Sequence, residues 1–383
     1  MANEVNYGSK KLLLWKETTK GVTPATIANA YSVKMLNFSL AESQKKETNP
    51  MLGNGGQASS TDYGSSDYSG NVECKYTGGI MPILLHHIVG AGTKTDATAD
   101  AYAISTAYIA GDIVNGVVNS AYSFVCKTAG TTGGTEPTIT TEVDGDEITD
   151  GTVVWILRTK LKGYTGSLKP CLETLGIESI SETGCEVTPV TFKERYNGVF
   201  LNSFEIAKSN GTIIYKYSLP AIAMNRIDSE NADFTEATIT TETEIVDNAF
   251  GFDDLTMTVG GVELDHVRSF RLTVNRNTTV EDGSKKGEKI DNTPIPTVDG
   301  EIMIKFSKEQ YTEAYNNTAK GIVMTFGKVN GDATVLTFPR VELQRSPLTY
   351  STNEPIYISI PLNAYGDSTT ATMSYSCVSA TDY

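Results

Sequence analysis

The sequence predicts a mainly β protein with two tandem β-sandwich or barrel domains, each carrying one short helix, and a small β-sandwich module inserted into the first domain. Three observations support this fold class. The chain of 383 residues is longer than one ordinary core, only 20% of its residues are charged while Gly and Tyr are abundant, and stretches of its first half recur in its second half. The length allows two or three domains, and the composition favours strands over helices.

The clearest recurrence is a pair of alternating apolar segments. VKMLNFSLAE, from Val33, and VRSFRLTVNR, from Val267, both alternate apolar with other residues. When the two valines are aligned, Leu36 matches Phe270. Because this alternation has the period of a strand, both segments are predicted to be half-buried strands.

A second recurrence follows further along each half. SGNVECKY (69–76) matches DGEIMIKF (299–306), with Gly70 against Gly300. Both stretches are predicted strands. The alternation places three side chains on one face of the first strand, those of Val72, Cys74 and Tyr76.

Each of these strands is followed by a predicted short helix. In the second half, Ser307 and Gln310 have the spacing of a capping box, and the helix is predicted to end at Gly321. In the first half the helix is predicted from about Gly79 to Val89, in a stretch whose Pro is tolerated in the opening turn.

The spacing of the matches locates an insertion. A third match pairs FEIAKSNGTIIYKYSLPAIA (204–223) with VELQRSPLTYSTNEPIYISIPLNA (341–364), each a strand, a turn and a strand. The offset between halves falls from 234 residues at the first match and 230 at the second to 137 at the third, so the first half carries roughly ninety extra residues. The predicted plan is a first domain of 1–98 and 161–235, an inserted surface module of 99–160, and a second domain of 236–383.

The inserted module has strand and turn signals of its own. YIAGDIVN, SAYSFVCKTAGTTGGTEP and EITDGTVVWILRT are predicted to form three short strands bounded by Gly-rich and Asp-Gly turns. The flanking stretches GAGTKTDATADA and LKGYTGSLKP have the composition of linkers or loops.

One stretch raises the question of a metal or catalytic site, because residues 69–90 hold a cysteine and two of the three histidines. His86 and His87 are adjacent, so on a helix they point about 100° apart and cannot hold one metal ion from one face. His266 is distant in sequence, and the matching stretch of the second half has neither His nor Cys. A structural role is therefore predicted for the pair, and no metal ligand is assigned.

The cysteines are predicted to be buried free thiols. Their odd number and wide spacing fit neither a disulfide framework nor paired zinc knuckles. The five are Cys74, Cys126, Cys171, Cys185 and Cys377.

Charge and hydropathy exclude several classes of partner. A net charge of -15 opposes binding to a polyanion, because phosphate contacts need clustered Lys and Arg. No apolar run reaches the roughly 18 residues that a membrane helix needs. The N-terminus lacks a signal-peptide pattern, so we expect a soluble protein made in the cytoplasm and no membrane partner.

Catalytic motifs are missing from the sequence. It has no Gly-x-Ser-x-Gly elbow, no phosphate-binding Gly-Lys-Ser/Thr loop and no dinucleotide fingerprint, so neither an enzyme nor a cofactor is predicted. VDGDEITD (143–150) carries several carboxylates but not the twelve-residue calcium loop, and is predicted to be a solvated acidic turn. A catalytic site assembled from distant residues stays open.

The opening GSKKLLLWKETTKGVTPAT (8–26) runs from an apolar strand into a Glu-Thr-Thr-x-Gly-x-Thr-Pro turn. With the repeated order of strand, loop, Gly-led strand and short helix, it resembles the tail tube proteins of long-tailed bacteriophages over roughly 1–95 and 160–383. The resemblance implies a structural virion protein of the phage tail whose subunits polymerise into stacked rings.

Further expectations follow from this resemblance. Single-domain members form rings of six subunits, so a duplicated domain implies three chains in each pseudo-hexameric ring. Phage DNA would pass through the lumen without specific binding, helped by an acidic wall that repels its backbone. The implied partners are further copies of the chain and the tape measure, terminator and distal tail components. The long polar loops 52–70 and 277–297 are expected to order against adjacent subunits or rings.

The insert resembles small β-modules of phage tail and tail-fibre proteins, most specifically in Asp-Gly-Thr-x-x-Trp from Asp150 to Trp155. Tyr108, Tyr122 and Trp155 could form an aromatic platform for sugar rings, which suggests contact with a host surface glycan. The other interpretation, favoured for Trp155, places it with Phe124 in the module core. The alternative function is thus a glycan-binding or adhesive virion protein, and a third is a secreted β-sandwich hydrolase or lectin.

Overall fold

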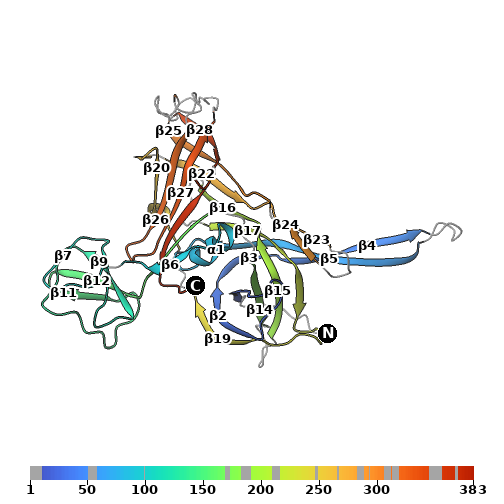
Figure 1. The fold of residues 1–383 in the computed structure, drawn as a ribbon, viewed down its shortest axis with the longest axis horizontal. Helices are drawn as coiled ribbons and strands as arrows, with labels where there is room; N and C mark the ends of the chain where they lie inside the picture. The colour runs from blue at the N-terminus through green and yellow to red at the C-terminus, as the bar shows by residue number, and fades with distance from the viewer. Residues whose placement is uncertain are drawn as a thin grey trace.

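The computed structural model describes residues 11–50, 58–98, 100–168, 173–182, 191–208, 216–245, 249–264, 267–282, 289–292, 294–305, 312, 319–344, 356–366 and 370–383. Figure 1 shows a lower barrel, an upper lobe of long strands, a small module to one side and a two-stranded arm that extends to the other side. Strands dominate all four parts, so the mainly β prediction is confirmed.

The lower barrel is built from seven strands that each pair antiparallel with the next. Their order in space is β2-β1-β14-β15-β17-β5-β3. The strands are β1 (Lys11–Lys16), β2 (Thr26–Val33), β3 (Met35–Phe38), β5 (Ala58–Lys75), β14 (Leu175–Glu182), β15 (Thr191–Leu201) and β17 (Lys216–Ala223).

The upper lobe repeats this order with seven strands from the second half of the chain. These also pair antiparallel, as β21-β20-β26-β27-β28-β25-β22. The strands are β20 (Leu255–Val259), β21 (Val262–Glu263), β22 (Val267–Asn275), β25 (Thr297–Lys305), β26 (Ala319–Gly327), β27 (Ala333–Leu343) and β28 (Tyr357–Ala364), and the short 3₁₀ helix η1 (Phe252–Asp254) precedes them.

The two sets also agree in register at the first strand pair. Phe38 lies opposite Val72, as Phe270 lies opposite Ile302, and each pair of strands has an irregularity in its register four residues or fewer before that phenylalanine. Phe38 therefore corresponds to Phe270. The sequence comparison matched Leu36 with Phe270 and is wrong by two residues, a shift that leaves the same face buried because a strand has a period of two.

In each strand set, a glycine lies close to the backbone of the neighbouring strand. A Cβ added to Gly70 would lie 2.3 Å from the carbonyl oxygen of Ser39, and one added to Gly300 would lie 2.4 Å from that of Arg271. Only glycine allows this close approach of the two strands. The predicted match of these two glycines therefore has a common physical cause.

The hairpins of the third match agree in register at a different point. Asn202 N–H donates to the carbonyl of Pro220 at 2.7 Å, and Gln344 N–H donates to that of Pro361 at 3.0 Å. Asn202 therefore corresponds to Gln344. The sequence comparison, which aligned residue 204 with residue 341, is wrong by five residues at this strand.

One strand joins the lower barrel to the upper lobe. β16 (Ser203–Lys208) pairs on one side with β17 and on the other with β22, from Ser203 opposite Asn275 to Lys208 opposite Phe270. The sheet is therefore continuous from the first strand set into the second, and a single hydrophobic core cluster draws on both.

The predicted helix of the first half is confirmed. α1 (Met81–Ile88) lies within the predicted span, and all its residues except His86 are buried. Figure 1 places it at the centre of the molecule, between the lower barrel and the upper lobe. The strand face of Val72, Cys74 and Tyr76 is also buried, as predicted.

The predicted helix of the second half lies almost entirely outside the described residues. Its predicted end is wrong, because β26 begins at Ala319 and Gly321 already lies within that strand.

The inserted module contains more strands than predicted. A four-stranded sheet has the order β11-β12-β9-β8, and β10 pairs with β7. The strands are β7 (Ala107–Tyr108), β8 (Ile113–Asn115), β9 (Tyr122–Thr128), β10 (Gly130–Thr131), β11 (Glu147–Asp150) and β12 (Val153–Thr159).

The flanks of the module are strands, so the prediction of linkers is wrong. β6 (Thr93–Asp96) pairs with β13 (Lys162–Ser167), and β13 also pairs with β29 (Ser374–Ser379) near the end of the chain. The flanking composition is polar because β6 is an exposed edge. Its backbone is nevertheless fixed by this ladder.

Other strands extend the barrel and form the arms. β19 (Thr238–Glu244) pairs parallel with β2, so a strand beyond the predicted boundary at 235 belongs to the lower sheet. The division into domains stays a prediction. The remaining strands are β4 (Ala41–Pro50), β18 (Asn225–Asp228), β23 (Thr279–Asp282) and β24 (Lys289–Asn292).

The first strand is buried on both faces because cores lie on both sides of it. Leu12 and Leu14 join the main cluster, while Leu13 and Trp15 pack in a smaller one with Ile27. The Trp15 ring is only 1% exposed and lies against β14.

Gly176 tests this packing. A Cβ added there would lie 2.0 Å from a Trp15 ring atom, so Gly176→Ala should lower the free energy of unfolding by about 1–3 kcal/mol, the usual cost of overpacking a core. Gly327→Ala is the control, because no atom lies within 4 Å of its added Cβ. Thermal unfolding of both variants measures the difference, and equal stability would contradict the packing described here.

Candidate assembly interface

The most prominent candidate for contact with other molecules is the arm formed by β4 and the first half of β5. The two strands pair from Ala41 opposite Ser69 outward to Pro50 opposite Ala58. Figure 1 shows this ribbon extending well beyond the body. A two-stranded ribbon without a core of its own is marginally stable in water, so the arm is suited to packing on another surface.

A smaller hairpin occupies the corresponding place in the second strand set. β23 pairs with β24, and β23 lies near β17 of the lower barrel. Lys45 Nζ, from the base of the large arm, lies 2.6 Å from Asp282 of β23 and 3.4 Å from Asp67 of β5. These exposed ion pairs add little stability but show that the hairpin from the second set lies against the first.

Both long loops of the sequence thus form ribbons where they are described. Residues 58–70 belong to β5, and 277–297 include β23 and β24. Their ordering against adjacent subunits or rings stays a prediction.

The adjacent histidines meet the last residue of the chain. His86 Nε2 contacts a carboxylate oxygen of Glu173, and His87 Nε2 contacts the Tyr383 hydroxyl. The Tyr383 ring stands edge-on to both imidazoles, with centroids 5.2 and 5.8 Å apart. Burial, followed by the neighbouring His86, lowers the pKa of His87 to about 3.

This environment supports packing rather than ligand binding. Burial alone raises the pKa of Glu173, but bonds from His86 and from Lys16, at 3.0 Å, outweigh it and lower the pKa to about 2. Among the residues that the structure describes, no group of three or more His, Cys, Asp or Glu side chains could hold a metal ion. His266 lies outside those residues.

The cysteines that the structure describes are buried thiols that form no disulfide with one another. They are Cys74, Cys126 and Cys377, as predicted, while Cys171 and Cys185 lie outside the described residues.

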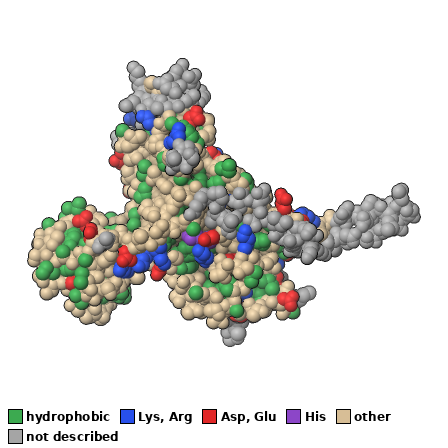
Figure 2. All heavy atoms as spheres, viewed as in Figure 1, with side chains coloured by type: hydrophobic (Ala, Val, Ile, Leu, Met, Phe, Trp, Pro, Cys, Tyr) green, Lys and Arg blue, Asp and Glu red, His purple; other side chains and the backbone are tan. Residues whose placement is uncertain are grey.

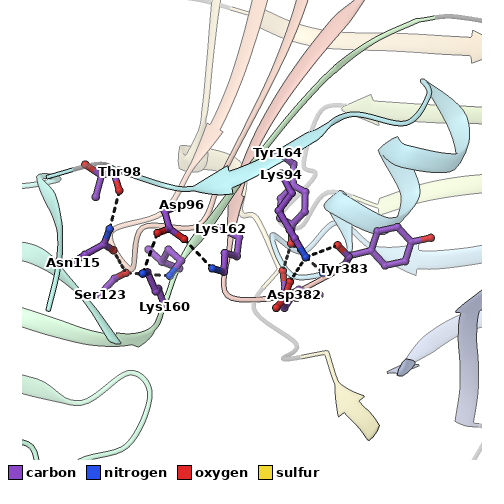
Figure 3. A network of polar contacts seen from close by, with 12 residues as sticks. Lys94, Asp96, Thr98, Asn115, Ser123, Lys160, Lys162, Tyr164, Asp382 and Tyr383 are labelled. Atoms are coloured by element: carbon purple, nitrogen blue, oxygen red, sulfur yellow. Dashed lines mark hydrogen bonds and ion pairs between the residues drawn. The ribbon is translucent and has the colours of Figure 1, made fainter. Parts of the chain in front are cut away.

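A polar network fixes the base of the module to the body. Lys160 and Lys162 lie 3.0 and 2.8 Å from the carboxylate of Asp96, and Lys94 Nζ lies 2.5 Å from that of Asp382 (Figure 3). Hydrogen bonds to Lys162 and then Lys160 lower the pKa of Asp96. Figure 2 shows the basic side chains gathered at this junction.

A second contact, which leaves no signal in the sequence, docks one face of the module on the body. Arg158 donates to the carbonyl of Asn330 at 2.6 Å and to the carboxylate of Asp332 at 3.3 Å. Burial raises the pKa of Asp332, although Arg158 opposes this shift. Beside this pair, Val125, Ile156 and Leu161 form an apolar cluster. Val378 of β29 and Ala380, just after that strand, pack against it.

Trp155 fills the core of the module. It is 0% exposed and packs with Tyr102 and Phe124, so its ring has no face free for a sugar. Asp150 explains the rest of the motif, because its carboxylate accepts hydrogen bonds from Tyr102 Oη at 2.5 Å, Gly133 N–H at 2.8 Å and Trp155 Nε1 at 3.4 Å.

The two other aromatic candidates are only partly buried. Tyr108 packs edge-on against Trp155, with ring centroids 5.1 Å apart, and Tyr122 lies at the margin of the same core. Tyr108 also lines a cleft of about 550 Å³ between β7 and β8, together with Asp100 and Asp112. The structure does not bring Tyr122 into that cleft.

Carboxylates of the acidic turn at 143–150 make hydrogen bonds and an ion pair within the module. Asp144 accepts hydrogen bonds from Arg158 and from the Thr159 N–H, Asp146 accepts one from Val143, and Glu147 pairs with Lys127. This use of the carboxylates agrees with a turn rather than a calcium loop.

The Glu-Thr-Thr-x-Gly turn near the N-terminus is held by its own glutamate. The Glu17 carboxylate accepts hydrogen bonds from Gly21 N–H at 2.9 Å, Gly198 N–H at 2.8 Å and Thr174 Oγ1 at 2.5 Å. Burial raises the pKa of Glu17 in spite of these bonds. The motif therefore ties the end of β1 to β15.

No helix in the described part of the chain is long and apolar enough to span a membrane.

The buried histidine predicts a pH dependence. The folded-state pKa of His87, about 3, lies below the ordinary 6.5, so between these values the unfolded chain binds the proton more strongly. The free energy of unfolding should fall as the pH is lowered from 6.5 to 4.5, by up to about 1.4 kcal/mol per unit. His87→Gln cannot take up the proton and should flatten this slope in thermal unfolding. An unchanged slope would contradict the assignment.

The module core predicts a local loss of stability. Asp150→Ala leaves three donors without their acceptor and should destabilise the module by about 3 kcal/mol or more. Asp146→Ala removes one exposed bond and is the matched control. Limited proteolysis within 99–160 should be accelerated in the first variant only, and equal protection of both would contradict the role of Asp150.

Comparison with known proteins identifies the family. No curated protein matches the chain. A family model described as phage tail tube protein matches residues 8–364, which include both strand sets, the arm and the module. The chain therefore belongs to the phage tail tube protein family, whose members are structural proteins of the phage virion.

Proposed function

We propose that the chain is a major tail tube subunit with a duplicated tube domain, and that it polymerises as stacked trimeric rings to form the conduit for phage DNA. The observation that carries this proposal is the agreement of two strand sets in order and direction. Both run through seven strands with antiparallel neighbours throughout, and both carry the same irregularity before Phe38 and Phe270.

The pairing of β16 with β22, which connects the two strand sets, supports a ring of three chains. β16 carries the sheet from the lower barrel into the upper lobe without a break. If one strand set of each chain pairs with the next chain as the two sets pair within a chain, three chains give a ring of six equivalent strand sets. Every inner strand then has two neighbours. Completing exposed edges in this way removes the aggregation hazard of a free strand.

The arms support contact across subunits. Within the chain, the β23–β24 hairpin of the second set lies against the first, with Lys45 paired to Asp282. The β4–β5 arm extends away from its own body, where a neighbouring subunit or ring would offer the equivalent surface.

An acidic chain suits a conduit. The net charge of -15 gives a wall that repels the DNA backbone, so that the polymer slides without specific binding. The further partners in this proposal are the tape measure, terminator and distal tail components, and synthesis takes place in the host cytoplasm.

A second candidate function is glycan binding by the module. The cleft beside Tyr108 supports it, because the aromatic ring can stack on a sugar while the nearby carboxylates of Asp100 and Asp112 accept hydrogen bonds from its hydroxyls. Trp155 takes no part in this candidate site, because its ring is fully buried.

Electron microscopy separates these functions. Concentrated protein should form stacked rings or tubes in negative stain, and light scattering should give species built from trimers. Deleting 99–160 should leave the tubes intact but thinner, because the module docks on the body through Arg158 and its neighbours and contributes no strand to either set. Discrete monomers would contradict the tube function, and a stable hexamer of chains would contradict the duplicated domain.

A further inference from the structure

The turn between β26 and β27, residues 328–332, is named here the hairpin tip. Figure 1 shows β26 and β27 descending from the upper lobe toward the side of the molecule that carries the module. Gly331 N–H donates to the carbonyl of Lys328 at 3.0 Å, and Lys328 N–H donates to that of Asp332 at 2.9 Å. The side-chain amide of Asn330 also donates to the Asp332 carboxylate at 3.0 Å. The tip therefore has a defined shape of its own.

The module packs closely on this tip. Gly331 has a φ of +87°, and a Cβ added to it would lie 2.8 Å from a methyl carbon of Val125 and 3.0 Å from one of Leu161. Only glycine allows both this turn and this close approach. The bonds from Arg158 to Asn330 and Asp332 lie at the same contact, and the side chains of Arg158 and Asp332 are only 8% and 7% exposed.

The module carries an apolar face that depends on this contact for its burial. Successive residues of a strand point to opposite faces, so Phe124 and Trp155 fill the module core while the next residues along, Val125 and Ile156, point away from it. Val125 is nevertheless 1% exposed and Ile156 8%. On a module that stood free of the body, both side chains would face water.

A second part of the chain also lies against the tip. A Cβ added to Gly78 would lie 2.6 Å from the Asp332 Cβ and 3.0 Å from its Cγ. Gly78 lies in the turn between β5 and α1, which precedes the module in the chain. Asp332, from the second half, thus contacts both this turn and the module, which both belong to the first half.

We propose that the module has a structural function within the single chain, which is to hold the hairpin tip of the second strand set on the first half. The strand that leaves the module adds to this hold, because β13 pairs with β29, which in turn pairs with β27. The module thus stabilises the position of the upper lobe on the lower barrel. This function is separate from glycan binding and does not require polymerisation.

Removing Arg158 tests the hold from the side of the module. Arg158→Ala leaves the Asp332 carboxylate buried without its cation, which costs more free energy than a tenfold change in an opening equilibrium. Hydrogen exchange of the amides in 328–332 should become faster by about tenfold or more, although the substitution lies in the module. Lys127→Ala is the matched control, because the exposed pair of Lys127 with Glu147 stays within the module. Equal exchange of the tip in the two variants would overturn the proposal.

A pair of glycines tests the hold from the side of the tip. Gly331 and Gly261 both have positive φ, at +87° and +82°, and both lie in turns between strands of the upper lobe. A Cβ added to Gly261 meets no atom within 4 Å, whereas one added to Gly331 meets the module. Gly331→Ala should therefore accelerate exchange in β12 of the module, and Gly261→Ala should not. The same exchange of β12 in both variants would overturn the proposal.

The unmodified protein offers a test that does not depend on how the variants fold. Native-state hydrogen exchange at rising denaturant concentration shows which segments open together. The amides of β12 and of 328–332 should open as one unit, with the same dependence on denaturant. A module that opens at lower denaturant while the tip keeps its full protection would show that the module does not hold the tip.

Discussion

The backbone ladder between β16 and β22 is the interaction on which the rest of the structure depends. Each of its strands would otherwise present unpaired N–H and C=O groups along a free edge, which is costly in a buried setting and hazardous in an exposed one. By pairing with β17 on its other side, β16 makes the two strand sets one sheet. The buried helix α1 and the shared core cluster lie against this continuous surface, so neither set is a separate body connected by a flexible linker.

The strands and their repetition could be predicted from the sequence, but their register could not. Alternation of apolar residues located β3, β5, β22 and β25, because half-burial leaves a period of two in the residues. A shift of two residues preserves that pattern, so the match of Leu36 with Phe270 looked as good as that of Phe38 with Phe270. The irregularity in register before each phenylalanine leaves no signal in composition, and only the paired backbones reveal it.

The module shows the same division between local and distant causes. Its turn motif ending at Trp155 could be recognised from sequence, because it depends on the local contact between Trp155 and Asp150. The sequence alone did not decide whether Trp155 lies in the core or contacts sugars. The docking of Arg158 on Asp332 joins residues far apart in the chain and had no sequence signal. The composition of the flanks does not reveal their strands, because the partner of β13 is β29, at the opposite end of the chain.

The matching irregularities at Met35/Asn37 and Val267/Ser269 have a mechanical consequence. An extra residue in one strand of an antiparallel pair bends that strand and increases its local twist. Both strand sets therefore bend at the same place relative to their own cores. In the proposed ring, the wall would turn in six equal steps, although only three chains build it. The diameter of the channel would then be set by the bend within each domain. The contacts between chains would need to match the angle of this bend rather than create it.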